Sequence, residues 1–250
     1  MGMYVVSHKE VKKYFPEGYK TIIVNANRNN VTGDLYDNTG DNISQKNGSY
    51  CELTAIYWLW KNNSDEFVGI DHYRRFFMDE GKLLSVDKAK TMVKDGSVVL
   101  SKKEKFNKKM STLYWSTSGY RSDIKVIYDA ISKVSPEYKS DFIYFMKQKA
   151  MYCYNMAVMN RETFNNYCKW LFSVLAEVEN TLNRNSNGEF NRKGYYKRIY
   201  GFIAERLLNV YLIHNDISIV EKPIKFTGEK VSVIKHLINK FNKLKDKYLR

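Results

Sequence analysis

A cluster of ionisable side chains directly follows a short apolar run near residue 70. The run Phe67-Val68-Gly69-Ile70 stops at Asp71-His72-Tyr73-Arg74-Arg75. Two adjacent guanidiniums offer fixed forks of donors that suit phosphate oxygens, and a carboxylate suits a cation or a sugar hydroxyl. The alternative is a surface turn whose arginines pair with nearby carboxylates, because structural ion pairs also gather charge at such places.

A second polar group follows another short run of strand type. Tyr4 to Val6 is β-branched and aromatic, and it ends at Ser7-His8-Lys9. In open α/β sheets, ligands bind in the crevice outside the carboxyl ends of the strands. Each of the two polar groups therefore marks a strand end at which a binding site is expected.

The composition indicates a folded domain with an anionic partner. The 250 residues are 44% hydrophobic and 15% aromatic, which is enough to build a core and unlike a disordered chain. The net charge of +14 favours a nucleic acid, a nucleotide phosphate or an acidic membrane surface as partner. An AT-rich coding sequence would also enrich lysine, so the charge alone does not choose among them.

The cysteines and the apolar runs point to the cytoplasm. Cys51, Cys153 and Cys168 share no metal-binding or disulfide spacing. The start of the chain lacks the features of a signal peptide, and no apolar run approaches the roughly 20 residues that span a bilayer. We expect a cytoplasmic protein, either soluble or bound to the inner membrane face.

Strands and helices must position these groups. We predict strands at 4–6, 21–24, 67–70, 97–100 and 150–160, the last with Asn155 in its interior. Helices are predicted at 51–62, 86–94, 140–149, 162–182 and 201–213, and in the second half of 113–135. Ser49 and Glu52 match a capping box for the first helix, and the last helix holds Glu205 and Arg206 among apolar residues.

Two lysine-rich segments remain. The run from Lys102 to Lys109 predicts a solvated loop. In Val231 to Leu249 an apolar stripe repeats at helical spacing with lysines around it, a pattern typical of an interfacial anchor. A helix docked on its own domain would show the same pattern.

Several segments together resemble one bacterial family. The stretches Asp41 to Asn47, Tyr50 to Asn62 and Gly69 to Phe77 resemble, in order and spacing, the family catalogued as domain of unknown function 4422. Tyr4 to Lys9 and Gly201 to Leu208 look like its first and last landmarks. The resemblance extends to about residue 225.

The resemblance implies a nucleotide-sugar enzyme of bacterial surface polysaccharide synthesis. Its members are regarded as glycosyltransferases, with galactosyl and galactofuranosyl transfer from UDP-sugars among the attributed activities. The implied fold is a single GT-A-like (Rossmann-like) α/β domain with a mixed, mainly parallel central sheet flanked by helices. We assign residues 1–228 to that domain and 229–250 to a basic amphipathic C-terminal helix.

The metal is left open by the sequence. GT-A enzymes usually hold a divalent cation through Asp-x-Asp, which does not occur in this sequence. Asp71 stands at the corresponding place as a single acid, so Mn²⁺ or Mg²⁺ would need further oxygen ligands. Alternatively, Arg74, Arg75 or Arg206 neutralises the leaving diphosphate without a metal.

Each step of glycosyl transfer has candidate residues. Asp71 and Glu205 compete as the base, and an internal pair of Glu205 with Arg206 is the alternative for that acid. Glu52 is interpreted as a helix cap. The predicted donor-binding residues are Ser7, His8, Lys9, Asp41, Asn42, His72, Arg74, Arg75, Asn155 and Arg206.

The expected partners follow from this interpretation. They are a UDP-sugar, a lipid-linked glycan acceptor and, through the tail, an anionic membrane surface. The rival classes are a basic nucleic-acid-binding module, for which no binding motif is found, and an inactive sugar-binding or scaffold partner of a transferase.

Overall fold

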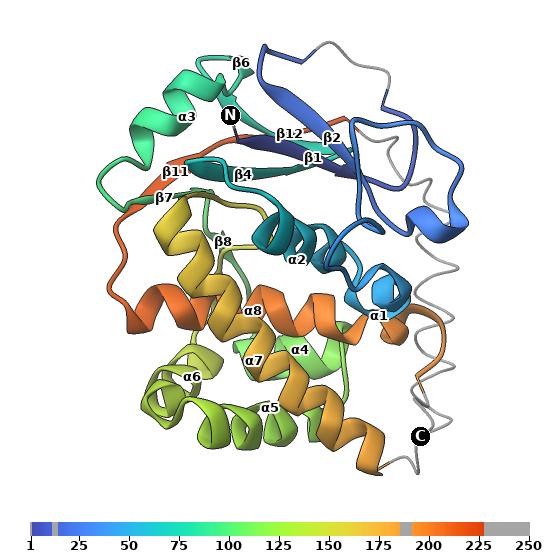
Figure 1. The fold of residues 1–250 in the computed structure, drawn as a ribbon. Helices are drawn as coiled ribbons and strands as arrows, with labels where there is room; N and C mark the ends of the chain where they lie inside the picture. The colour runs from blue at the N-terminus through green and yellow to red at the C-terminus, as the bar shows by residue number, and fades with distance from the viewer. Residues whose placement is uncertain (1, 12–14, 186–191, 228–250) are drawn as a thin grey trace, which may run out of the picture.

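The fold is built on one twisted sheet with helices on both faces (Figure 1). The computed structural model describes residues 2–11, 15–185 and 192–227. The strands along the main path of the ten-stranded sheet are, in spatial order, β11 (Ile219–Lys222), β7 (Val98–Ser101), β10 (Val158–Asn160), β4 (Phe67–His72), β1 (Met3–Ser7), β2 (Tyr19–Ile23) and β3 (Leu35–Tyr36).

Along this path only β10 is reversed. It pairs antiparallel with both β4 and β7, whereas β1 pairs parallel with β2 and β4, and β11 with β7. The remaining strands are β5 (Arg75–Asp79), β6 (Lys82–Leu83), β8 (Glu104–Lys105), β9 (Ala150–Met151) and β12 (Ile224–Phe226). The predicted mixed, mainly parallel sheet is confirmed.

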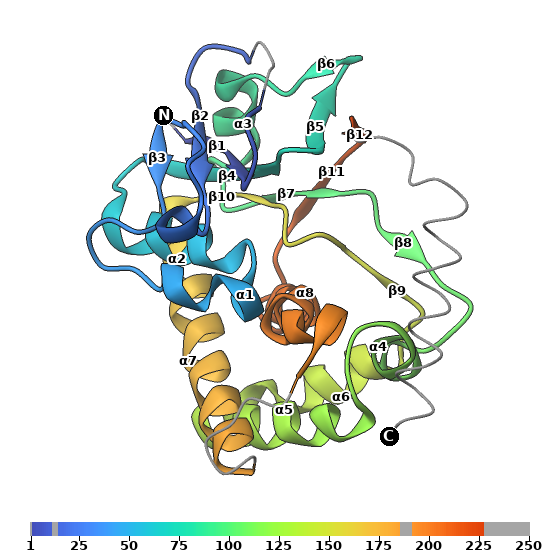
Figure 2. The same cartoon turned by 90° about the vertical axis from the view of Figure 1, so that its right-hand side faces the viewer.

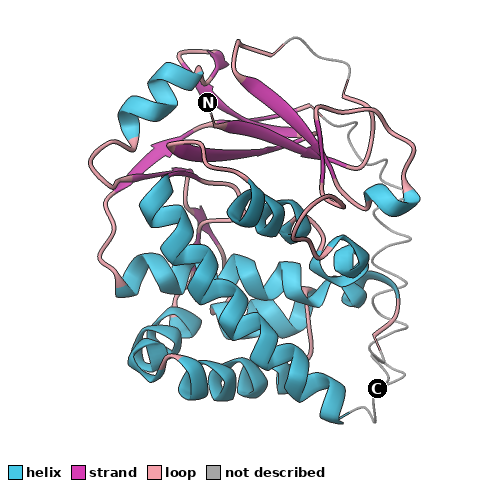
Figure 3. Cartoon of the chain, in the orientation of Figure 1, coloured by secondary structure: helices cyan, strands magenta, loops and turns pink. Residues whose placement is uncertain are grey.

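The helices form two layers on one side of the sheet and a single cover on the other (Figure 3). The α-helices are α1 (Asn47–Tyr50), α2 (Leu53–Asn62), α3 (Val86–Met92), α4 (Met110–Thr117), α5 (Arg121–Val134), α6 (Lys139–Lys147), α7 (Arg161–Asn185) and α8 (Ile199–His214). Helix α3 covers one face; α2, α7 and α8 cover the other, with α4, α5 and α6 beneath them. Within the described ranges, no helix is both long enough and apolar enough to cross a membrane.

Alternation along the central strands explains why both faces are covered. In β1, Met3 belongs to the core on the α3 side and Tyr4 to the larger core on the other side. In β4, Phe67 belongs to the core on the α3 side and Val68 to the larger core. Successive strand residues point to opposite faces, so a strand buried on both sides is a continuous apolar run.

Two predicted elements are wrong in detail. The helix predicted at 51–62 begins at Leu53, because Cys51 adopts φ 55° and separates it from α1. Ser49 lies within α1, and no side chain caps α2. The strand predicted at 150–160 is interrupted by a turn in which Tyr154 and Asn155 both have positive φ.

The tail lies outside the described residues. Our prediction of a basic amphipathic helix at 229–250 therefore stays a prediction. The same holds for the anchor that we expect there.

Candidate active site

A cleft of about 450 Å³ opens at the carboxyl ends of β1, β2 and β4. The chain passes from β1 to β2 on one side, whereas β4 pairs with β1 on the other side. Such a reversal of strand order is the topological switch point at which open α/β sheets bind ligands. The cleft therefore lies where the two polar groups of the sequence predicted a site.

The end of β1 forms one wall of the cleft. Ser7 and His8 line it. The Ser7 hydroxyl donates to the carbonyl of Lys9 at 2.5 Å and accepts from the Lys9 amide at 3.0 Å, so it stabilises the turn that follows the strand. Lys9 itself is exposed and is absent from the lining.

The end of β4 forms the opposite wall with His72, Tyr73, Arg74 and Arg75. The Arg74 guanidinium lies over the Tyr73 ring at 4.8 Å. That of Arg75 contacts the rings of Tyr154 at 4.4 Å and Phe226 at 5.4 Å. Within the described residues, no salt bridge joins either arginine to a carboxylate. The alternative of an ion-paired surface turn therefore finds no support among them.

A third guanidinium reaches the cleft from a distant part of the chain. Arg198 ends the 3-10 helix Gly194–Arg198, and its Nε donates to Cys51 Sγ at 3.2 Å. Burial raises the pKa of the Cys51 thiol to about 11, so Cys51 stays protonated at neutral pH. Arg198 was not among the predicted residues, and no local pattern marks it.

Both histidines of the cleft are neutral at pH 7. Burial lowers the pKa of His72 to about 4; the Glu52 carboxylate opposes this shift, and Arg75 and Arg198 add to it. Desolvation and the cations Lys9, Arg74 and Arg198 lower the pKa of His8 as well. The positive charge of the cleft therefore belongs to its arginines, and each imidazole keeps one donor and one acceptor.

Glu52 is the carboxylate among the side chains that line the cleft. The Asn155 side-chain amide donates to Glu52 Oε1 at 2.7 Å and to the Gly201 carbonyl at 3.0 Å. Glu52 does occupy the N-cap position of α2, as we interpreted it, but its side chain makes no capping hydrogen bond and is directed to Asn155 instead. Asn155 acts on the cleft through Glu52 and is absent from the cleft lining.

Uncommon backbone conformations converge on this pair. Cys51, directly before Glu52, has φ 55° and ψ −129°, and Tyr154 and Asn155 have φ 81° and 52°. Positive φ is rare for residues other than glycine and costs about 1–3 kcal/mol when the conformation is strained. Such conformations concentrate at functional sites, where the surrounding structure holds them.

Asp71 lies on the other side of the sheet from the cleft. It is fully buried, and its Oδ1 accepts from the Phe77 amide at 3.1 Å. Burial raises the pKa of Tyr19, which lies on the α3 side, and the Asp71 carboxylate adds to that shift. Because neighbouring strand residues point to opposite faces, His72 faces the cleft and Asp71 does not. This geometry argues against Asp71 as base or metal ligand.

Glu205 and Arg206 form the internal pair that we had named as the alternative. Arg206 Nη1 donates to Glu205 Oε2 at 2.9 Å and to the Phe202 carbonyl at 3.1 Å. Burial raises the pKa of Glu205, and the Arg206 cation opposes that shift. Neither side chain lines the cleft, so the predicted roles as base and diphosphate ligand lack a position there.

Asp41 joins its loop to α2, Asn42 makes hydrogen bonds within that loop, and neither residue lines the cleft. The Asp41 carboxylate accepts from the Tyr57 hydroxyl at 3.1 Å, and the Asn42 amide donates to the Gly40 carbonyl at 2.9 Å. Our prediction that they border the nucleotide has no support in this geometry.

The lining of the cleft provides few oxygen ligands for a divalent ion. Among residues 2–11, 15–185 and 192–227, no three His, Cys, Asp or Glu side chains are grouped as metal ligands would be. The lining offers the Glu52 carboxylate, whereas Mg²⁺ and Mn²⁺ prefer several oxygens. The residues present therefore do not fit an all-protein metal site.

Comparison with known proteins gives two matches. A protein family described as Domain of unknown function (DUF4422) matches residues 2–216. The apo structure of WbbM, a bifunctional glycosyltransferase, is similar with a TM-score of 0.80 and 30% sequence identity. The match covers 91% of this chain and 45% of the WbbM chain, so this chain spans less than half the length of that protein. A search of curated proteins finds no match.

Proposed function

The chain belongs to the DUF4422 family and has a GT-A-like fold, and from these premises we propose that it is a glycosyltransferase. The reaction is the transfer of a hexose from a UDP-sugar to a lipid-linked oligosaccharide in bacterial surface polysaccharide synthesis. The observation that carries the proposal is the cleft at the switch point, which Arg74, Arg75 and Arg198 line together with Glu52.

The three arginines are the proposed ligands of the donor diphosphate. Guanidiniums bind phosphate oxygens in bidentate fashion and stay charged at all relevant pH values. As the bond between the anomeric carbon and the diphosphate breaks, the electron pair leaves with the phosphate oxygen. Fixed positive charges at that point stabilise the transition state more than the ground state.

Glu52 is the proposed general base when the anomeric configuration is inverted. The acceptor hydroxyl oxygen attacks the anomeric carbon, and its proton moves to the Glu52 carboxylate. The 2.7 Å hydrogen bond from Asn155 holds that carboxylate in one orientation. Asn155 is therefore a positioning residue, in place of the direct donor contact that the sequence predicted.

The donor sugar and the metal are finer parts of the proposal. The family resemblance favours galactose or galactofuranose as the transferred hexose. The arginine-rich lining supports charge neutralisation by the protein, and any Mn²⁺ or Mg²⁺ would take most of its ligands from the diphosphate and water. The basic tail, which lies outside the described residues, is the proposed contact with an anionic cytoplasmic membrane face.

A screen of UDP-sugars for slow hydrolysis tests the proposal. We expect UDP-galactose or UDP-galactofuranose to be hydrolysed by the wild-type protein and not by Arg75→Gln. Arg121→Gln, at an exposed arginine at the start of α5 outside the cleft, is the matched control. Hydrolysis that Arg75→Gln leaves unchanged would contradict the proposed site.

A further inference from the structure

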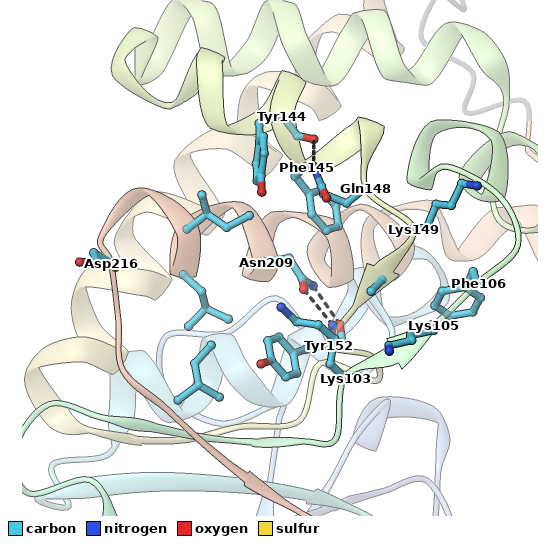
Figure 4. A pocket seen from close by; sticks show the side chains of 14 residues that line it. Lys103, Lys105, Phe106, Tyr144, Phe145, Gln148, Lys149, Tyr152, Asn209 and Asp216 are labelled. Carbon is cyan, nitrogen blue, oxygen red and sulfur yellow. Dashed lines mark hydrogen bonds between the residues drawn. The ribbon is translucent and has the colours of Figure 1, made fainter.

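A second groove of about 750 Å³ lies below the sheet, between β8, β9, α6 and the end of α8 (Figure 4). In Figure 2, β8 and β9 extend from the main sheet toward α4 and α6. The lysine run 102–109, predicted as a solvated loop, contributes β8, which pairs with β9. Lysines of that run therefore lie in a defined wall.

One side of the groove is apolar and open to solvent. Tyr144 and Phe145 on α6 line it, as does Ile213 near the end of α8. Tyr144 is 55% exposed and Ile213 is 37% exposed. Large apolar side chains left open at a concave surface mark sites for apolar ligands or partners.

The other side carries positive charge. Lys103, Lys105 and Lys149 line the groove, and the Lys103 ammonium lies over the Tyr152 ring at 4.7 Å. In the part of the chain that the structure describes, no salt bridge joins these three lysines to a carboxylate. Asp216 is the carboxylate among the lining side chains, so the lining has a net positive charge.

The floor between the two sides is fixed by a buried amide. Asn209 on α8 accepts from the Tyr152 amide at 2.8 Å and donates to the Tyr152 carbonyl at 2.9 Å, as Figure 4 shows. Both residues are buried. This pairing ties β9 to α8, so the groove does not need to form when a ligand arrives.

Shared lining residues connect the groove to the donor cleft. Lys103 also lines a middle pocket of about 550 Å³, together with Glu104 and Tyr154. Arg75 and Phe226 line both that pocket and the cleft. The three hollows therefore follow one another along the surface, with the donor cleft at one end and the apolar, cationic groove at the other.

We infer that this second groove binds a phosphate-bearing lipid, with the phosphate on Lys103 and Lys105, which lie two residues apart on one face of the β8 segment, and the apolar chain against Tyr144 and Ile213. The inference rests on the proposed function, because this lipid is the one that carries the oligosaccharide acceptor. The middle pocket then lies where the glycan would run between the carrier and the donor cleft. A molecule with both a phosphate and a hydrocarbon chain would contact the cationic wall and the apolar wall at once. A free anion would contact only the cationic wall, and a neutral lipid only the apolar wall.

Direct binding of dodecyl phosphate, below its micelle concentration, tests the inference. We expect the double variant Lys103→Glu/Lys105→Glu to weaken binding about tenfold or more, because both charge-assisted contacts with the phosphate are lost. Lys147→Glu, at an exposed lysine of α6 outside the lining, is the matched control and should bind like the wild type. Tyr144→Ser should also weaken binding, whereas Ile143→Ser, at the exposed neighbour outside the lining, should not.

Three outcomes would overturn the inference. They are equal binding by the wild type and the double variant, equally tight binding of neutral dodecyl maltoside, and inorganic phosphate binding as tightly as dodecyl phosphate. The thermal shift with UDP is measured on the same variants. If the wild type responds to UDP but does not bind dodecyl phosphate, the inference about the groove fails and the proposed function is unaffected. If the wild type shows no response to UDP, the result counts against the proposed function.

Discussion

The side-chain amide of Asn155 donates a 2.7 Å hydrogen bond to the carboxylate of Glu52, across 103 residues of sequence. The contact joins a residue that the sequence marked as a donor ligand to one that it marked as a helix cap. Both residues lie beside backbone with positive φ. The pair therefore defines the acid of the cleft and the group that orients it.

Glu52→Gln should abolish transfer and leave donor binding intact. Glutamine keeps the shape of the side chain but accepts a proton poorly, and loss of a general base lowers the rate by about 10²–10⁴-fold. We expect this loss in kcat. The UDP affinity should stay within about twofold of the wild type, because a general base acts on the acceptor hydroxyl and not on the nucleotide. Asp41→Asn, a carboxylate-to-amide change outside the cleft, is the control. A Glu52→Gln enzyme with normal kcat would show that the base lies elsewhere.

The low pKa of His72 predicts loss of stability in acid. Its pKa of about 4 lies below the ordinary value of 6.5, so the unfolded chain binds the proton more readily between these values. The stability that neutral His72 contributes to the folded state is therefore fully present above pH 6.5, and it is lost as the pH falls toward 4. Relative to His72→Gln, the wild type should lose about 1–2 kcal/mol of unfolding free energy between pH 7 and pH 5. Urea unfolding at both pH values measures this difference, and parallel pH dependence of the two proteins would refute it.

Two glycines should respond to alanine in opposite ways. A Cβ at Gly119 would lie 2.4 Å from the buried Tyr114 ring, whose hydroxyl donates to Asp123 at 3.0 Å. Gly119→Ala should therefore lower the free energy of unfolding by about 1–3 kcal/mol. A Cβ at Gly201 would lie 3.6 Å from Cys51, an ordinary contact, so Gly201→Ala within α8 should not lower it. Chemical denaturation of both variants checks the pair, and equal stability of the two would contradict the packing described.

Removal of divalent metal should leave UDP binding in place. The positive charge of the cleft comes from Arg74, Arg75 and Arg198, and Glu52 is the carboxylate of its lining. We expect the UDP dissociation constant in EDTA to stay within about threefold of that in manganese, since fixed guanidiniums bind the diphosphate themselves. UDP binding that disappears in EDTA and returns with manganese would show that a metal ion supplies the positive charge that binds the diphosphate.

The sequence predicted the sheet and the place of the site. Apolar runs that stop at polar residues identified β1 and β4, because central strands buried on both faces read as continuous apolar segments. The ends of these strands provide Ser7, His8, His72, Arg74 and Arg75, which line the cleft. The same property hid the orientation of Asp71, since a strand that is apolar on both faces does not reveal which face holds a ligand.

The remaining site residues depend on contacts between distant segments. Glu52 matched a capping box with Ser49, but the turn at Cys51 ended that helix and directed Glu52 to Asn155. Arg198 reaches the cleft from the other end of the chain, beside Cys51. Local patterns describe neighbours along the chain, so they missed the contact of Glu52 with Asn155 and the position of Arg198. The same limit explains the roles assigned to Asp41 and Asn42, which lie in a loop outside the cleft.

Calorimetric titration of UDP into the wild type, Arg74→Ala and Arg121→Ala tests the central claim, that the cleft at the switch point binds a nucleoside diphosphate. The account predicts that Arg74→Ala binds about tenfold or more weakly, the effect of losing one bidentate contact with phosphate, and that Arg121→Ala binds like the wild type. Equal UDP affinity in Arg74→Ala and the wild type would contradict the claim. So would a wild type that ignores UDP but binds an oligonucleotide in a salt-sensitive way.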